Sequence, residues 1–371
     1  MVNHLGNWRN GELGNFITLK RGFDLPQQKR EDGQVPIFSS SGITGTHSTA
    51  MVNAPGVITG RYGTIGEVFY AAEDFWPLNT TLFVEDFHGN DAEFIYYFLK
   101  TLEWSKFTSA SAVPGINRNT VHKETVSLPD IETQRRIAST LSMLDEKIKT
   151  NTEINDNLYA QAKAIFDNHF INIDAIPAGW RKGNLLDIAN YLNGLAMQKF
   201  RPQGNEIGLP VLKIKELRQG SCDDSSELCS LRIKPEYIIH DGDVIFSWSG
   251  SLLVDIWCGG TCGLNQHLFK VTSDIYDKWF YYLWTARHLA RFIAIAADKA
   301  TTMGHIKREE LAKAEVLIPC EEDYTSLTSI MQPIFELIIS NRIEARKLAA
   351  LRDELLPKLM SGEIDVSAIQ L

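Results

Sequence analysis

The chain has 371 residues, of which 44% are hydrophobic and 22% charged, a composition typical of a globular protein in water. No apolar run reaches the ~18 to 20 residues that a membrane span needs. The first residues also lack the basic, apolar and small-residue order of a secretion signal. We therefore expect a cytoplasmic protein without membrane contact. The net charge of −9 argues against a binder of nucleic acid with a uniformly basic surface.

The cysteines indicate free thiols. Their number is five, and an odd number in the second half of a long chain argues against a disulfide framework. Cys258 and Cys262, with His267 close behind, lack the second pair that zinc sites usually show. We expect reduced thiols and no metal site.

The two halves of the sequence match each other in order. Residues 8–13 match 180–185, 56–58 match 243–245, 78–83 match 264–269, 96–97 match 281–282, and 116–118 match 306–308. The offset grows from 172 residues (8 to 180) to 190 residues (116 to 306), which indicates insertions in the second copy. Such ordered similarity predicts a tandem duplication.

Each copy begins with a region rich in glycine, threonine, serine and aromatic residues. Short apolar runs separated by turn residues predict β-rich domains over 1–130 and 171–324. Apolar residues at helical spacing predict minor helices over 92–106 and 278–295.

Each copy ends in a long helix, predicted over 131–170 and over 325–371 with its tail. Apolar residues alternate at spacings of four and three, which is typical of a coiled-coil seam. The seam positions are Ile137, Leu141, Leu144, Ile148, Ile154, Leu158 and Ile165 in the first helix and Ile330, Ile334, Leu337, Leu348, Leu351 and Leu355 in the second. Pro357 is expected to end the second helix.

These elements predict an α+β protein with two β-rich domains separated by two long helices. The helices are expected to pack as an antiparallel coiled coil, with a pseudo-twofold internal repeat. Asn151 and Asn341 occupy corresponding seam positions, where a polar residue commonly fixes register. The alternative is that Asn151 begins a frayed or kinked stretch.

Motifs for catalysis are absent from the sequence. It contains no glycine-rich nucleotide loop, no Asn-Pro-Pro-Tyr element of adenine methyltransferases, no nucleophile elbow and no zinc-protease helix. The sequence predicts a binding protein and not an enzyme.

Several segments resemble one family. Residues 128–148, LPDIETQRRIASTLSMLDEKI, resemble the central conserved region of specificity subunits of type I restriction–modification systems, and 355–364, LLPKLMSGEI, resemble their C-terminal conserved end. Residues 176–180 (IPAGW) and 60–66 (GRYGTIG) resemble segments of target-recognition domains. Two departures stand out. At the start of the second long helix, EEDYT (321–325) stands where the first long helix begins with ETQ (132–134). In the second domain, FSWSG (246–250) stands where the first domain has TGRYG (59–63).

The resemblance implies a non-catalytic subunit that serves in phage defence. Each target-recognition domain would read one half of a split site in double-stranded DNA, and the helix pair would hold the half-sites at a fixed spacing. Two methyltransferase (modification) subunits would dock on the helices, and restriction (translocase–nuclease) subunits would join them. This chain would hold no cofactor, whereas the partner subunits would bring S-adenosylmethionine, ATP and Mg.

Candidates for DNA contact are polar and basic side chains that can bond to base edges and phosphates. They are Ser40, Ser41, Thr44, Thr46, His47, Arg61, Tyr62, Asn117 and Arg118 in the first domain, and Lys213, Lys215, Ser247, Trp248, Ser249, Lys307 and Arg308 in the second. The alternatives are a solvated hairpin for 39–47, a surface ion pair for Arg61, and packing for Tyr62 and Trp248.

Candidates for partner contact lie on the long helices. They are Arg135, Arg136, Arg342, Arg346 and Lys347, with an ordinary solvated face as the alternative. No block of the sequence is strongly basic, so any basic surface has to be assembled by folding. That acidic balance also keeps open a second function, a duplicated scaffold for protein partners without base readout.

Overall fold

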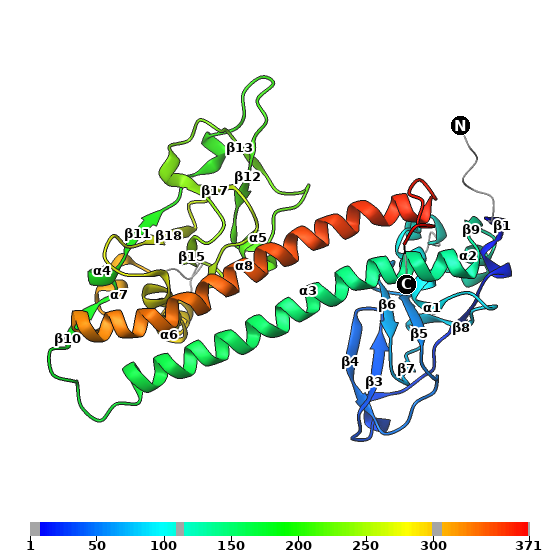
Figure 1. Ribbon diagram of the computed structural model, residues 1–371, viewed down its shortest axis with the longest axis horizontal. Helices are drawn as coiled ribbons and strands as arrows, with labels where there is room; N and C mark the ends of the chain where they lie inside the picture. The colour runs from blue at the N-terminus through cyan, green and yellow to red at the C-terminus, as the bar shows by residue number, and fades with distance from the viewer. Residues whose placement is uncertain (1–7, 109–114, 299–305, 370–371) are drawn as a thin grey trace. The chain divides into compact units, whose positions relative to one another are not determined.

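The computed structural model describes residues 8–108, 115–298 and 306–369 (Figure 1). The chain forms two compact units. Unit 1 comprises 1–146 together with 349–371, and unit 2 comprises 147–348. Unit 1 is therefore built from both ends of the chain, whereas unit 2 is continuous.

Unit 1 is built on two sheets and a ribbon. The four-stranded antiparallel sheet has the order β2 (Thr18–Arg21), β8 (Thr81–Asp86), β5 (Gly56–Gly60) and β6 (Val68–Ala71). The three-stranded sheet has the order β4 (Gly42–His47), β3 (Val35–Ser39) and β7 (Trp76–Pro77), and the ribbon pairs β1 (Arg9–Glu12) with β9 (Thr125–Leu128). All five residues of β5 are buried, which makes this strand the centre of the core.

Unit 1 also contains short helices. They are η1 (Leu13–Asn15), η2 (Gln27–Lys29), α1 (Ala92–Lys100), η3 (Trp104–Phe107) and α2 (Arg118–His122). The Asp91 carboxylate caps α1 by accepting a hydrogen bond from the Phe94 amide at 2.9 Å. The helix predicted over 92–106 is too long, because α1 ends where the Thr101 hydroxyl donates to the Phe98 carbonyl at 2.7 Å.

Unit 2 repeats this arrangement, with one more strand in its second sheet. Its antiparallel sheet has the order β11 (Asn190–Asn193), β18 (Leu268–Thr272), β15 (Val244–Ser247) and β16 (Leu253–Ile256). Its second sheet has the order β13 (Leu228–Cys229), β12 (Leu209–Leu212), β17 (Cys262–Leu264) and β14 (Ile238–Ile239), and its ribbon pairs β10 (Arg181–Asn184) with β19 (Glu315–Ile318). Its short helices are α4 (Leu185–Ile188), η5 (Met197–Lys199), α5 (Ile214–Gln219), η6 (Pro235–Tyr237) and α7 (Arg308–Ala312). The predicted second minor helix is α6 (Lys278–Asp298).

The backbone hydrogen bonds correct one of the sequence matches. The Thr81 amide donates to Leu78 at 2.9 Å, and the Leu268 amide donates to Asn265 at 3.0 Å. Leu78 therefore corresponds to Asn265 and not to Leu264, so that sequence match is wrong by one residue. The Leu-Asn pair occurs in both copies, but the strands that follow it begin one residue later in the second.

The two long helices are α3 (Ile131–Phe166), followed by a π-helical turn η4 (Asp167–Ile171), and α8 (Glu321–Met360). The expectation that Pro357 ends α8 is wrong, since the helix continues to Met360. Leu359 and Met360 are buried in the core of unit 1, and this burial stabilises the last turn beyond the proline. Within the described ranges no helix is long and apolar enough to cross a bilayer.

Within each unit the long helices contact one another. In unit 2, Lys147 pairs with Glu344 at 3.3 Å and the side-chain Nδ2 of Asn155 donates to the Ile338 carbonyl at 3.2 Å, so α3 and α8 run antiparallel there. In unit 1, Arg352 of α8 pairs with Asp145 of α3 at 2.5 Å.

Some predicted seam positions face solvent. Ile154, Ile330, Leu337 and Leu351 are 41 to 50% exposed. The buried line on α8 instead follows Leu327, Met331, Phe335, Ile338 and Asn341. The reason is that Leu327, Met331 and Phe335 belong to the hydrophobic core of unit 2, so α8 turns this face towards its own unit.

All five cysteines are free thiols, and Cys258 and Cys262 are buried. Burial raises the pKa of the Cys258 thiol to about 11. In the part of the chain that the structure describes, no three His, Cys, Asp or Glu side chains are grouped to hold a metal ion.

Candidate nucleic-acid interface

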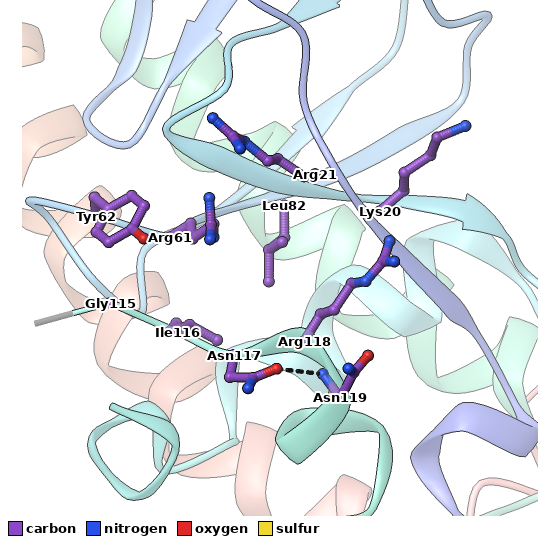
Figure 2. A pocket seen from close by; sticks show the side chains of 10 residues that line it. All are labelled: Lys20, Arg21, Arg61, Tyr62, Leu82, Gly115, Ile116, Asn117, Arg118 and Asn119. Atoms are coloured by element: carbon purple, nitrogen blue, oxygen red, sulfur yellow. Dashed lines mark hydrogen bonds between the residues drawn. The ribbon is translucent and has the colours of Figure 1, made fainter. Parts of the chain in front are cut away.

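Unit 1 carries a basic cavity of about 580 Å³ (Figure 2). Four cations line it, and they come from three separate segments: Lys20 and Arg21 from β2, Arg61 from the end of β5, and Arg118 from α2. Folding thus assembles a basic cluster that no block of the sequence contains.

The floor of the cavity is a backbone junction. The Ile116 amide donates to the Arg61 carbonyl at 3.0 Å, and Tyr62 and Gly115 form an antiparallel bridge. A Cβ on Gly115 would lie 2.2 Å from Cε1 of Tyr62, so this close approach requires glycine. The Arg61 guanidinium lies over the Tyr62 ring, 4.5 Å from its centroid, and the two predicted side chains therefore form one preorganised group.

The cations of the cavity differ in whether they already make hydrogen bonds or ion pairs within the unit. Lys20 is paired with Glu85, and the Arg21 Nε donates to the Asn79 carbonyl at 3.4 Å. No hydrogen bond or ion pair among the described residues engages the exposed guanidinium of Arg118. Asn117 caps α2 by accepting from the Asn119 amide at 3.0 Å, which fixes the position of Arg118 beside the cavity (Figure 2).

A histidine that the sequence did not single out joins α2 to the sheet. The Leu19 amide donates to Nε2 of His122 at 2.9 Å, which requires the neutral ring. Burial lowers the pKa of His122, and the nearby Arg118 lowers it further. Lys20, Arg21 and Asn119 were also missed, although the Lys-Arg pair at the end of a strand is a signal that the sequence offers.

The predicted hairpin residues form a separate group. Ser40 and Ser41 lie in the turn between β3 and β4, and Thr44 and Thr46 are exposed on β4. His47 is buried, and its Nδ1 accepts from the Glu31 amide at 3.1 Å. His47 therefore has a structural role in holding the hairpin, while the two threonines present free surface.

In unit 2 the same junction carries different side chains. The Ile306 amide donates to the Trp248 carbonyl at 3.0 Å, as Ile116 does to Arg61. The Trp248 indole donates to Oδ1 of Asn193 at 2.9 Å. Lys307 is exposed at the N-terminus of α7, and Arg308 donates to the Tyr191 carbonyl at 3.4 Å.

The two serines beside Trp248 lie beneath the surface. Ser247 and Ser249 are buried; Ser247 donates to the Ser251 carbonyl at 3.0 Å, and Ser249 bonds to Nδ1 of His267 at 2.9 Å. Their hydroxyl groups hold the loop that presents Trp248.

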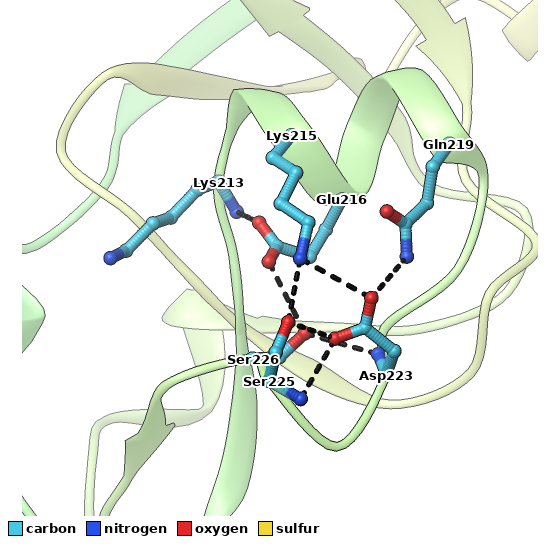
Figure 3. A network of polar contacts seen from close by, with 7 residues as sticks. All are labelled: Lys213, Lys215, Glu216, Gln219, Asp223, Ser225 and Ser226. Carbon is cyan, nitrogen blue, oxygen red and sulfur yellow. Dashed lines mark hydrogen bonds and ion pairs between the residues drawn. The ribbon is translucent and has the colours of Figure 1, made fainter. Parts of the chain in front are cut away.

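Lys213 and Lys215 lie in a network of polar contacts around α5 (Figure 3). Lys213 is paired with Glu227, and Lys215 is paired with Asp223 at 3.2 Å. Hydrogen bonds from Ser225, Gln219 and Lys215 hold the pKa of Asp223 well below its usual range. A contact of either lysine with DNA would therefore have to compete with an ion pair inside the unit.

Asn151 and Asn341 meet on facing helices. The side-chain Nδ2 of Asn151 donates to Oε2 of Glu344 at 2.7 Å and to the Asn341 carbonyl at 3.5 Å. The side-chain Nδ2 of Asn341 donates to Oδ1 of Asn155 at 3.0 Å. The two predicted register residues thus belong to one polar cluster, which also includes Asn155.

The predicted partner residues divide into two groups. Arg342 bonds to Asp255 and to the Ile256 carbonyl, and Arg346 bonds to Asp241 and to the Cys258 carbonyl, all at 2.7 to 2.9 Å. These arginines therefore hold α8 against its own sheet, a role that the sequence did not reveal because it depends on helix rotation. Exposed surface is provided instead by Arg135 and Lys347, while Arg136 pairs with Glu132 at 2.6 Å.

The repeated fold and its repeated junction define a class of duplicated two-domain proteins. The family model described as the Type I restriction modification DNA specificity domain matches residues 6–160 and 177–351. The chain belongs to this family, which is defined by DNA specificity and not by a catalytic activity.

Known proteins agree with this assignment. The chain is 26% identical over 310 residues to the type I restriction enzyme MjaIX specificity subunit of Methanocaldococcus jannaschii, covering 76% of this chain and 71% of that protein. It is 20% identical over 354 residues to the HindI specificity subunit of Haemophilus influenzae, covering 73% and 77%. The crystal structure of the type I S subunit from M. genitalium shares the fold, with a TM-score of 0.64, 15% identity and 97% of each chain covered.

Proposed function

We propose that the chain selects a bipartite DNA site for a type I restriction–modification complex, with one half-site contacted by each unit. The observation that carries this proposal is the basic cavity of unit 1, built on a backbone junction that recurs in unit 2. Arginine and lysine side chains in such a cavity attract phosphates and can donate to guanine edges.

The long helices have two roles in this proposal. They set the spacing between the half-sites, since α3 and α8 of 36 and 40 residues have lengths of roughly 50 to 60 Å, whereas one turn of B-DNA spans ~34 Å. Their exposed surface, including Arg135 and Lys347, receives two modification subunits, and restriction subunits join that assembly. S-adenosylmethionine, ATP and Mg belong to those partners.

Mapping of methylated bases in a host tests the proposal. Cells that carry the chain with its modification subunit are compared with cells that lack the chain, and a split motif should appear only in the first. Arg61→Ala and Arg118→Ala should then weaken or relax one half of the motif and leave the other half unchanged.

The same experiment separates DNA reading from a scaffold function. A scaffold without base readout predicts that the methylated motif is unaffected by these variants. Loss of methylation with intact assembly would support the proposal, and an unchanged motif in both variants would contradict the assignment of the cavity.

A further inference from the structure

The two junctions can be compared position by position, because equivalent backbone hydrogen bonds occur in both. The Arg61 amide donates to the Thr80 carbonyl at 2.9 Å, and the Trp248 amide donates to the His267 carbonyl at 3.4 Å. In the same way, the Gly22 amide donates to Thr81 at 3.1 Å and the Gly194 amide to Leu268 at 3.0 Å. These bonds show that Arg61 is equivalent to Trp248. They also show that the end of β2, before Gly22, is equivalent to the end of β11, before Gly194.

The equivalent positions differ in charge. The four cations of the unit 1 cavity, Lys20, Arg21, Arg61 and Arg118, correspond to Leu192, Asn193, Trp248 and Arg308. Only one cation is kept, and it donates to the Tyr191 carbonyl. Lys307 replaces Asn117, but Glu309 replaces Asn119, so the second junction gains little positive charge.

Trp248 is held firmly in its place. Its indole nitrogen donates to Asn193, and its ring lies 5.7 Å from that of Phe269 at an interplanar angle of 33°. The residue remains half-buried, and the hydrogen bond of its indole to Asn193 lies at the surface. A fixed, neutral aromatic surface thus stands where unit 1 presents a guanidinium.

We propose that the two units bind their half-sites through different forces, an inference that rests on the proposed function. Unit 1 supplies most of the salt-dependent attraction to phosphates through Arg61 and Arg118. Unit 2 relies on an apolar contact of Trp248 with its half-site. Each phosphate that a cation neutralises contributes ~0.9 to the slope of log K against log salt, whereas an apolar contact contributes none.

The experiment measures the affinity of the full chain, assembled with its modification subunits, for a duplex that carries the methylated motif. Affinity is followed across a series of potassium chloride concentrations. The double variant Arg61→Gln/Arg118→Gln should lower the slope by about 1.8, that is, by two phosphate contacts. Trp248→Leu should weaken binding at every salt concentration without changing the slope, and Trp248→Arg should raise the slope by about 0.9.

Lys182→Gln provides the matched control, because Lys182 is an exposed cation of β10 that pairs with Glu315 at 2.8 Å and lies outside the long helices. It removes one positive charge and should leave the slope unchanged. Circular dichroism establishes that each variant is folded. A lower slope for Trp248→Leu, or an unchanged slope for the double arginine variant, would overturn the inference while site-specific binding itself persists. A wild-type complex with no preference for the motif would instead overturn the proposed function, and the inference with it.

Discussion

The guanidinium of Arg342 makes two hydrogen bonds to the carboxylate of Asp255, at 2.9 and 2.8 Å. This pair attaches α8 to β16 within unit 2, and Arg342 also donates to the Ile256 carbonyl at 2.7 Å. Because such side chains hold α8 against its own unit, they are not available to a partner. The residues that α8 can present to a partner therefore differ from those that its sequence suggests.

Removal of this pair should lower stability. For Arg342→Ala we expect the free energy of unfolding to fall by about 1 to 2 kcal/mol, because a half-buried carboxylate loses its charged donor. Urea denaturation followed by fluorescence measures the change. Lys347→Ala, on the exposed side of the same helix, should stay within about 0.5 kcal/mol of the wild type. Equal effects of the two variants would show that the pair does not stabilise the unit.

Gly115→Ala should disrupt the floor of the basic cavity. Its Cβ would lie 2.2 Å from the Tyr62 ring, and such overpacking costs about 1 to 3 kcal/mol. Tyr62→Ala in the same chain removes the ring and should restore part of that loss. A double-mutant cycle by thermal unfolding measures the coupling, and strictly additive effects would contradict a direct clash.

The polar cluster on the long helices should set their register. Asn151 Oδ1 is buried without a hydrogen-bond partner among the described residues, so Asn151→Leu together with Asn341→Leu should raise stability. The expected cost is a less defined alignment of the helices. Methylated motifs with a mixture of spacer lengths would reveal it, and a single unchanged spacer would contradict the register role.

An altered helix length should alter the DNA site. Insertion of one heptad in both α3 and α8, placed at equivalent levels, lengthens each helix by ~10 Å. The number of base pairs between the methylated half-sites should then increase, while the half-site sequences stay the same. Base-resolution methylation mapping gives the spacer directly, and the same spacer after the insertion would exclude a role of the helices in spacing.

His122 should make unit 1 sensitive to acid. Its pKa is lowered in the folded state by burial and then by Arg118, so the unfolded chain binds a proton more readily. The stabilisation that the neutral His122 ring gives to the folded unit is complete above the unfolded pKa of ~6.5. It is lost as the pH falls below that value. The difference in melting temperature between the wild type and His122→Gln should therefore shrink on going from neutral to acidic pH. A constant difference would show that the histidine does not titrate on unfolding.

The sequence predicts the repeated architecture well, because the duplication leaves similar segments that occur in the same order in both halves of the chain. It predicts the cavity only in part. Arg61, Tyr62, Asn117 and Arg118 were recognised from their local motifs, whereas Lys20 joins them only through the pairing of β2 with β8. Side-chain pairs such as Arg346–Asp241 depend on the rotation of a helix against a sheet, which a seven-residue pattern does not determine.

The discontinuous make-up of unit 1 has a consequence for biosynthesis. Leu359, Met360 and Val366, from the last part of the chain, are buried in its hydrophobic core. A ribosome therefore delivers every residue of unit 2 before the core of unit 1 can close. The nascent chain can complete unit 2 first, and unit 1 stays unfinished until Leu359, Met360 and Val366 have been synthesised.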